Sequence, residues 1–107
     1  MKGHPMILHC VFCALRPDAT PDAVARVMTA LDGLRAVLPG MTGFRHGPNR
    51  DFEGKSPGHG YGFVVTLTDA AANAAYLAHP QHRAIAADLV ALCAGGADGI
   101  VVYDLDV

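Results

Sequence analysis

The chain alternates between short apolar runs and a longer stretch in which apolar residues recur at helical spacing. Apolar runs rich in strand-forming residues occupy 6–15, 61–67 and 100–105, and a weaker run occupies 41–46. Runs of this length predict β-strands. Between residues 21 and 38, apolar residues at intervals of three and four predict an amphipathic helix with one face on a sheet. The pattern therefore predicts four strands with helical segments between them.

Capping residues and prolines set the expected ends of the helices. Thr20 precedes Pro21, which is typical of an N-cap followed by proline in the first helical position. The second helix is expected to begin after Asp69 and to break at Pro80, because proline disfavours α geometry in the residue before it. After this break the helix is expected to restart, with His79 as its cap, and to run to about Cys93.

The resulting order, β-α-β-β-α-β, defines the expected fold class. It predicts an α+β, ferredoxin-like domain in which helices cover one face of a four-stranded antiparallel sheet and the second helix is broken at Pro80. A length of 107 residues fits one domain, so we expect residues 1–107 to form a single unit.

The strands are apolar on both faces, which indicates a second packing surface. If Val11, Val65 and Val102 face the helices, the opposite face carries a set of mostly apolar side chains: Leu8, Cys10, Phe12, Val64, Val101, Tyr103 and Leu105. Contiguous apolar patches of this kind usually mark interfaces, and a twofold interface is self-complementary. The sequence therefore predicts a homodimer that pairs through this face of the sheet.

Composition and charge exclude several classes of partner. The chain is 51% apolar and 17% charged, with a formal net charge of -2, and its basic residues are scattered. We therefore expect no nucleic-acid partner, because no basic stripe could neutralise a phosphate backbone. No apolar run approaches the roughly 20 residues of a spanning helix, so we expect no membrane partner. Because Arg16-Pro17-Asp18 follows the first apolar run where a signal peptide has small residues, a cytoplasmic location is expected.

The cysteines do not predict a metal or redox site. Cys10 and Cys13 lie three residues apart on a predicted strand, so their side chains point to opposite faces and cannot share a disulfide or a metal ion. Together with Cys93 the chain has an odd number of cysteines, which fits a reducing compartment. The histidines have no carboxylate or cysteine at convincing metal-ligand spacing, so no metal is expected.

One segment resembles the signature of a known family. Residues 76–82 (YLAHPQH) resemble the Y-x-x-H-P-x-H motif of the stress-responsive A/B-barrel (Dabb) family. Four weaker elements agree with it, namely the opening strand at 7–12 with its histidine, the break at 38–41, the pair Gly60-Tyr61, and Tyr103-Asp104 near the end. The resemblance covers nearly the whole chain and implies a dimeric α+β barrel.

The resemblance also implies candidate site residues. One member is a plant polyketide cyclase in which the motif's tyrosine and last histidine carry an aldol condensation without metal or organic cofactor. By motif position these are Tyr76 and His82, with Asp104 as the supporting carboxylate and His9 lining the pocket. The chain departs from the cyclase at Phe63, which stands where the cyclase has a second pocket histidine. It departs again where the first helix of the cyclase offers a tyrosine and this chain has leucine.

The chemistry of these residues suggests how they could work together. His82 would begin a helix, where the dipole disfavours the imidazolium, whereas Asp104 would stabilise it. We therefore expect a hydrogen bond between His82 and Asp104, with Tyr76 lining the same space. The alternative is that the three form a buried brace between helix and sheet. The substrate pocket is expected to be lined by His9, Val11, Leu31, Phe44, Phe63, Val65 and Cys93.

Two functions from different classes follow. The first is a protein that binds a small apolar or polyketide-like ligand and performs cofactor-independent acid/base chemistry of the aldol or cyclase type. Cofactor-free monooxygenases of similar fold are a related enzymatic alternative. The second is a non-catalytic dimeric binding or stress-related structural module. A cavity reaching His82 would favour the first function, and a collapsed core of Leu31, Phe63 and Cys93 would favour the second.

Overall fold

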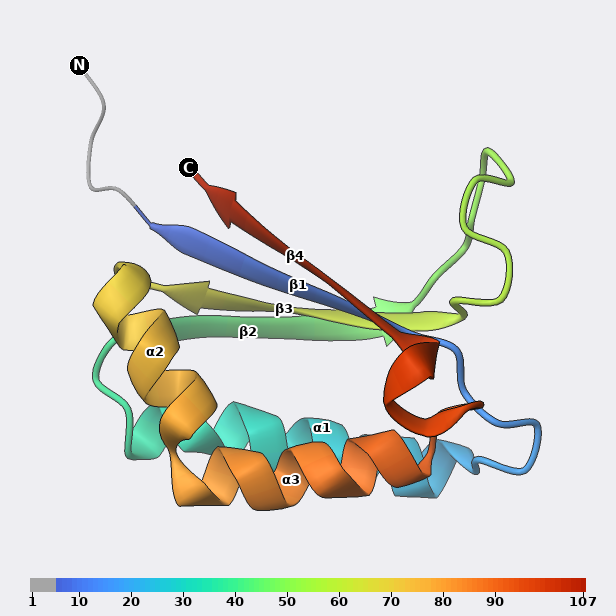
Figure 1. Cartoon of the computed structure of the whole chain (residues 1–107), viewed down its shortest axis with the longest axis horizontal. Helices are drawn as coiled ribbons and strands as arrows, with labels where there is room; N and C mark the ends of the chain where they lie inside the picture. The colour runs from blue at the N-terminus through green and yellow to red at the C-terminus, as the bar shows by residue number, and fades with distance from the viewer. Residues whose placement is uncertain (1–5) are drawn as a thin grey trace.

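The computed structural model describes residues 6–107, which fold into a single antiparallel sheet with helices on one side (Figure 1). The strands lie in the order β2-β3-β1-β4. Their bounds are Ile7–Cys13 for β1, Met41–Pro48 for β2, Tyr61–Leu67 for β3 and Ile100–Asp106 for β4. This arrangement confirms the predicted ferredoxin-like α+β fold.

Three α-helices and two 3₁₀ turns connect the strands. The helices are α1 (Pro21–Gly33), α2 (Ala70–Ala78) and α3 (Pro80–Ala91), and the turns are η1 (Leu34–Ala36) and η2 (Gly96–Gly99). α1 and α3 run side by side below the sheet, and α2 descends to meet α3 at a sharp corner (Figure 1). The covered face of the sheet is therefore the one toward these helices.

Local side-chain contacts explain where the helices begin. The Thr20 hydroxyl accepts a hydrogen bond from the Ala23 backbone N–H at 3.1 Å. The Asp69 carboxylate accepts one from the Ala72 N–H at 2.7 Å. Each side chain satisfies a backbone donor that would otherwise lack a partner in the first helical turn. Both caps were predicted, and both are confirmed.

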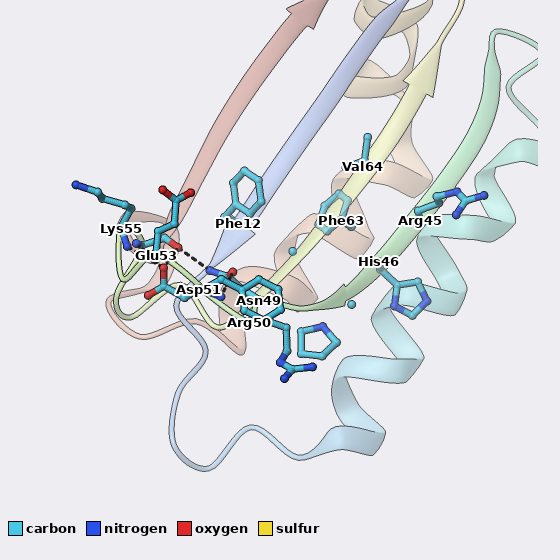
Figure 2. A pocket seen from close by; sticks show the side chains of 15 residues that line it. Phe12, Arg45, His46, Asn49, Arg50, Asp51, Glu53, Lys55, Phe63 and Val64 are labelled. Carbon is cyan, nitrogen blue, oxygen red and sulfur yellow. Dashed lines mark hydrogen bonds between the residues drawn. The ribbon is translucent and has the colours of Figure 1, made fainter.

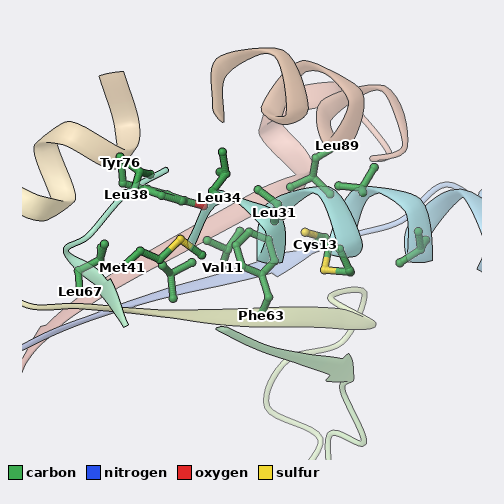
Figure 3. Close-up of a cluster of buried hydrophobic side chains, with 14 of the residues drawn as sticks. Val11, Cys13, Leu31, Leu34, Leu38, Met41, Phe63, Leu67, Tyr76 and Leu89 are labelled. Atoms are coloured by element: carbon green, nitrogen blue, oxygen red, sulfur yellow. The ribbon is translucent and has the colours of Figure 1, made fainter. Parts of the chain in front are cut away.

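The hydrophobic core fills the space between sheet and helices (Figure 3). Val65 and Leu67 of β3 are fully buried, and Met28 and Leu31 of α1 are 1% exposed. Full burial of an aliphatic side chain contributes about 1.5–3 kcal/mol. The core therefore holds α1 against the central strands.

No helix of residues 6–107 covers the opposite face of the sheet (Figure 1). Phe12 pairs with Val101, and Cys10 pairs with Tyr103, in the β1–β4 register. Tyr103 is 58% exposed and Leu105 is 49% exposed. The predicted division of side chains between the two faces is correct, and we call this second face the open face.

Burial at β4 departs from the expectation. Val102 lies on the side of the helices, as its pairing with the buried Val11 requires, but it is 45% exposed. The reason is that β4 is an edge strand, whereas α2 packs on β1, β2 and β3. Side chains of β4 are consequently only partly covered within one chain.

Candidate functional site

His9 and Asp104 form a hydrogen bond across two neighbouring strands. The two residues are direct partners in the antiparallel β1–β4 register, so both side chains point to the helical side. His9 Nδ1 lies 2.6 Å from Asp104 Oδ1, and because a carboxylate only accepts, Nδ1–H is the donor. His9 is buried, whereas the Asp104 side chain is 48% exposed. The bond fixes the ring, and in the neutral imidazole it leaves the lone pair on Nε2.

Tyr76 of α2 lies between two histidines. Its ring is in edge contact with His9, at 5.6 Å between centroids, and lies 4.3 Å from the ring of His82. Tyr76 is fully buried, and burial raises the pKa of its hydroxyl far above the usual value. The phenol therefore remains protonated and can donate a hydrogen bond throughout the physiological pH range.

His82 occupies the first turn of α3, where its surroundings favour the neutral imidazole. Burial is the main cause that lowers the pKa of its imidazole. The Leu77 carbonyl opposes this shift, while His9 and His79 add to it. Neutral imidazole has one nitrogen with a free lone pair, so His82 can accept a proton near neutral pH.

Three buried polar atoms, two in this cluster and one elsewhere on α2, have no hydrogen-bond partner within residues 6–107. They are the Tyr76 hydroxyl, His82 Nδ1 and the side-chain oxygen Oδ1 of Asn73. Buried polar groups are nearly always paired, since leaving one unpaired costs about 1–3 kcal/mol. Unpaired buried groups of this kind are typical of positions that a ligand or an ordered water satisfies.

Asn73 was not identified from the sequence. It stands one helical turn before Tyr76 in a segment that is otherwise mostly alanine, so the two residues share one side of α2. Asn73 could have been identified from its position three residues before the tyrosine of the motif, as the one amide side chain in an alanine-rich helix.

The expected partner of Asp104 was wrong. The carboxylate binds His9 rather than His82, and it is half exposed rather than buried. The strand register decides this outcome, because it places Asp104 directly opposite His9. His82, by contrast, lies on α3 against the ring of Tyr76. Within residues 6–107 the site therefore contains a histidine bound to a carboxylate and a histidine whose Nδ1 has no partner, on either side of a tyrosine.

His79 has the structural role that was predicted. Its backbone leaves the helical region just before Pro80, and its Nδ1 accepts a hydrogen bond from the Gln81 N–H at 3.1 Å. This cap begins α3 and fixes the corner between α2 and α3. The corner in turn places His82 against Tyr76.

Most residues expected to line a substrate pocket lie in the packed core. Phe44 is partly buried against this core, and the fully packed members of the set are Val11, Leu31, Phe63, Val65 and Cys93. Surface hollows occur elsewhere, one of about 320 Å³ between α1 and α3 and another of about 710 Å³ beside β2 and β3. Neither of these two hollows is lined by Tyr76 or His82.

The three cysteines are unbridged and buried. Burial, together with the neighbouring Cys93, raises the pKa of the Cys13 thiol to about 12. Cys10 lies on the open face, opposite to Cys13, as the strand assignment predicted. Across residues 6–107 no group of three histidine, cysteine or acidic side chains is placed to hold a metal ion.

Helices capable of crossing a membrane are also absent from the described part of the chain.

Solved structures of similar fold come from bacteria and plants. A dimeric ferredoxin-like protein of unknown function from Jannaschia sp. CCS1 is 50% identical, with a TM-score of 0.89, covering 95% of this chain and 99% of the other. Another, from Thermobifida fusca YX, is 25% identical with a TM-score of 0.76, covering 96% and 92% of the two chains. A hydroxynitrile lyase from Passiflora edulis is 16% identical with a TM-score of 0.82, covering 98% and 95%. This last likeness shows a shared fold alone.

Curated proteins gave no significant match to this chain. The family model described as the stress responsive A/B barrel domain matches residues 7–107, which include every strand and helix of the structure. The chain therefore belongs to the stress-responsive A/B barrel domain (Dabb) family.

Proposed function

We propose that this chain binds a small ketone or polyketide-like molecule and performs cofactor-independent acid/base chemistry of the aldol or cyclase type. The observation that carries the proposal is that two buried atoms of the cluster, the Tyr76 hydroxyl and His82 Nδ1, have no hydrogen-bond partner among residues 6–107. A carbonyl compound would supply the missing partners, because its oxygen accepts from the phenol and its acidic α-carbon proton lies next to the imidazole.

The proposed chemistry assigns one role to each side chain. Nδ1 of neutral His82 takes the proton from the carbon next to the carbonyl, and the electron pair of that C–H bond moves into an enolate. The Tyr76 hydroxyl donates a hydrogen bond to the enolate oxygen. His9, oriented by Asp104 at 2.6 Å, serves as the second proton-transfer group. The enolate then attacks a second carbonyl carbon in the aldol step, and the alkoxide that forms takes the proton from the His82 imidazolium, which restores the neutral imidazole.

Access to these atoms requires a local movement. Tyr76 is fully buried, so a ligand reaches its hydroxyl only when α2 shifts at the corner before Pro80. α2 is nine residues long, and Tyr76 is its one buried residue. A short helix with so little apolar anchoring opens at low cost compared with global unfolding.

The assembly that we propose is a homodimer through the open face, in the cytoplasm. Two relatives, 50% and 25% identical, are described as dimeric. The open face of this chain carries exposed Tyr103 and Leu105, together with Phe12 and Val101. Pairing of two such faces would remove this apolar surface from water. The three unbridged cysteines fit a reducing compartment.

A second candidate function is a non-catalytic dimeric binding or stress-related structural module. The packing of Leu31, Phe63 and Cys93, which are 1%, 4% and 3% exposed, favours it. In this reading the two histidines and Tyr76 form a brace that joins α2 and α3 to β1 and β4.

Deuterium exchange separates the two functions. Cyclohexanone and 4-phenyl-2-butanone are incubated with the protein in D2O near neutral pH, and loss of the α-proton signal is followed by NMR. We expect exchange faster than in buffer, lost in His82→Ala and reduced at least about 10-fold in Tyr76→Phe. His46→Ala, which removes an exposed histidine on β2, serves as the control and should retain the rate. Exchange no faster than in buffer, or equal in wild type and His82→Ala, would exclude the catalytic function.

A further inference from the structure

The loop between β2 and β3 is a structured arm. Residues 49–60, here called the hairpin arm, turn away from the helices and stand on the other side of the sheet (Figure 1). The Asp51 carboxylate accepts hydrogen bonds from the N–H groups of Lys55 and Ser56, at 2.9 and 3.0 Å, and from the Ser56 hydroxyl. Asn49 donates to the Ser56 hydroxyl and to the His59 carbonyl, both at 2.8 Å. These bonds give a glycine-rich loop a defined shape.

The arm holds an aromatic side chain in solvent. Phe52 is 87% exposed, with the Arg50 guanidinium 5.3 Å from the centre of its ring. Asp51, the preceding residue, adopts the left-handed region at φ 46°, which side-chain-bearing residues rarely occupy. A hydrogen-bonded turn thus presents a phenyl ring to water. A single exposed aromatic is unremarkable by itself, so the surroundings of the arm decide its meaning.

Two hollows flank the arm, and both have Phe12 of the open face in their walls. The larger, of about 710 Å³, is lined by arm residues together with Phe12 and Val64 (Figure 2). The smaller, of about 300 Å³, lies between the arm and the β4 residues Val101 and Tyr103. Both hollows therefore continue into the apolar surface that we propose as the dimer interface.

We propose that the hairpin arm of each chain is a clasp that closes on a second copy of this chain and buries Phe52. The inference rests on the proposed open-face dimer and names the element that completes it. An arm standing on the open face prevents a flat approach of two sheets, so the partner's surface must enter the hollows on both sides of it. By twofold symmetry each arm then reaches the other copy.

The size of the uncovered surface favours a second copy over a small molecule. The occupant must cover the two hollows and also Tyr103 and Leu105, which remain half exposed along β4. Stable interfaces bury about 800 Å² on each partner, which is the scale of a whole sheet face. A small ligand in one hollow would leave most of that surface in water.

The test compares Phe52→Ser with Val37→Ser by sedimentation equilibrium. Val37 follows η1 and is 48% exposed. Val37→Ser therefore removes an exposed apolar side chain away from the open face and serves as the matched control. Burial of each phenyl ring strengthens association at least about 10-fold, so two arms predict a dissociation constant raised about 100-fold in Phe52→Ser. Val37→Ser should stay within about twofold of wild type, and circular dichroism checks that both variants fold.

The outcomes distinguish the arm from the dimer itself. A wild-type protein that is monomeric at micromolar concentration would overturn the open-face dimer and the clasp together. A dimeric wild type whose dissociation constant is unchanged by Phe52→Ser would overturn the clasp and leave the open-face dimer standing. An equal rise of the dissociation constant in Phe52→Ser and Val37→Ser would also overturn the clasp, because the effect would then not depend on the arm.

Discussion

His9 Nδ1 and Asp104 Oδ1 lie 2.6 Å apart because antiparallel pairing of β1 and β4 places the two residues directly opposite each other. The contact spans 95 positions of the sequence and joins a central strand to an edge strand. Within residues 6–107, Nδ1 of His82 has no hydrogen-bond partner. The difference between a histidine bound to a carboxylate and a histidine whose Nδ1 has no partner in residues 6–107 is the basis of the proposed chemistry.

Replacement of Asp104 by Asn should destabilise the protein modestly. The His9–Asp104 bond is charge-assisted because its acceptor is a carboxylate, but the aspartate is 48% exposed and solvent screens it, so we expect a loss of about 0.5–1.5 kcal/mol. Urea unfolding at pH 6 measures the change. Asp88→Asn, which alters an exposed aspartate on α3, is the control and should change stability by less than about 0.5 kcal/mol.

Removal of the Tyr76 hydroxyl should not destabilise the free protein. The hydroxyl is buried and has no partner within residues 6–107, so Tyr76→Phe removes an unsatisfied polar group and should be neutral or stabilising by up to about 1 kcal/mol. Thermal unfolding without added ketone provides the measurement. A loss above about 1 kcal/mol would mean that the hydroxyl has a partner, such as a bound water, in the free protein.

Stability should fall as the solution is acidified through the range in which His82 titrates. Burial lowers the pKa of His82 in the folded state below its unfolded value near 6.5, so the unfolded chain binds the proton more readily. The stability present above pH 6.5 is therefore lost progressively as the pH falls toward the folded pKa. One proton gives a slope of at most about 1.4 kcal/mol per pH unit.

His82→Gln should flatten this part of the stability profile. Urea unfolding at several pH values from 7.5 to 5 compares the variant with wild type. His46→Gln, at an exposed position, should leave the slope in place. The same slope in His82→Gln as in wild type would assign the acid sensitivity to other groups.

Phe12→Asp should prevent dimer formation. Phe12 borders both hollows of the open face, so the substitution would bury an unpaired charge in the proposed interface. We expect a monomer or an aggregate at a concentration at which the wild type is a dimer, as measured by multi-angle light scattering. A stable Phe12→Asp dimer would place the interface on another surface.

The thiols should resist modification in the folded protein. Cys13 is fully buried, and burial raises its pKa to about 12, so almost no thiolate exists at pH 8. Cys93 and Cys10 are also buried. Iodoacetamide followed by mass spectrometry should show slow labelling in buffer and three labelled cysteines in urea. Rapid labelling of Cys13 in the folded protein would contradict its position in the core.

Local signals in the sequence determined the elements and their order. Thr20, Asp69 and the His79-Pro80 pair fixed the beginnings of the helices, because caps and prolines act on their own neighbours in the chain. Alternation along β1 and β3 correctly separated a core face from an open face, because side chains of a strand alternate between the two sides of its sheet.

The tertiary structure alone decided which distant side chains meet. The alternation of side chains along β4 predicts that Asp104 points toward the helices. Only the β1–β4 register, however, makes His9 rather than His82 its partner. Likewise the edge position of β4 leaves Val102 and Asp104 half exposed, and the shape of the hairpin arm holds Phe52 in solvent beside the open face. Such contacts depend on strand register and on the packing of whole elements, and these are set by many residues far apart in the chain rather than by any local pattern.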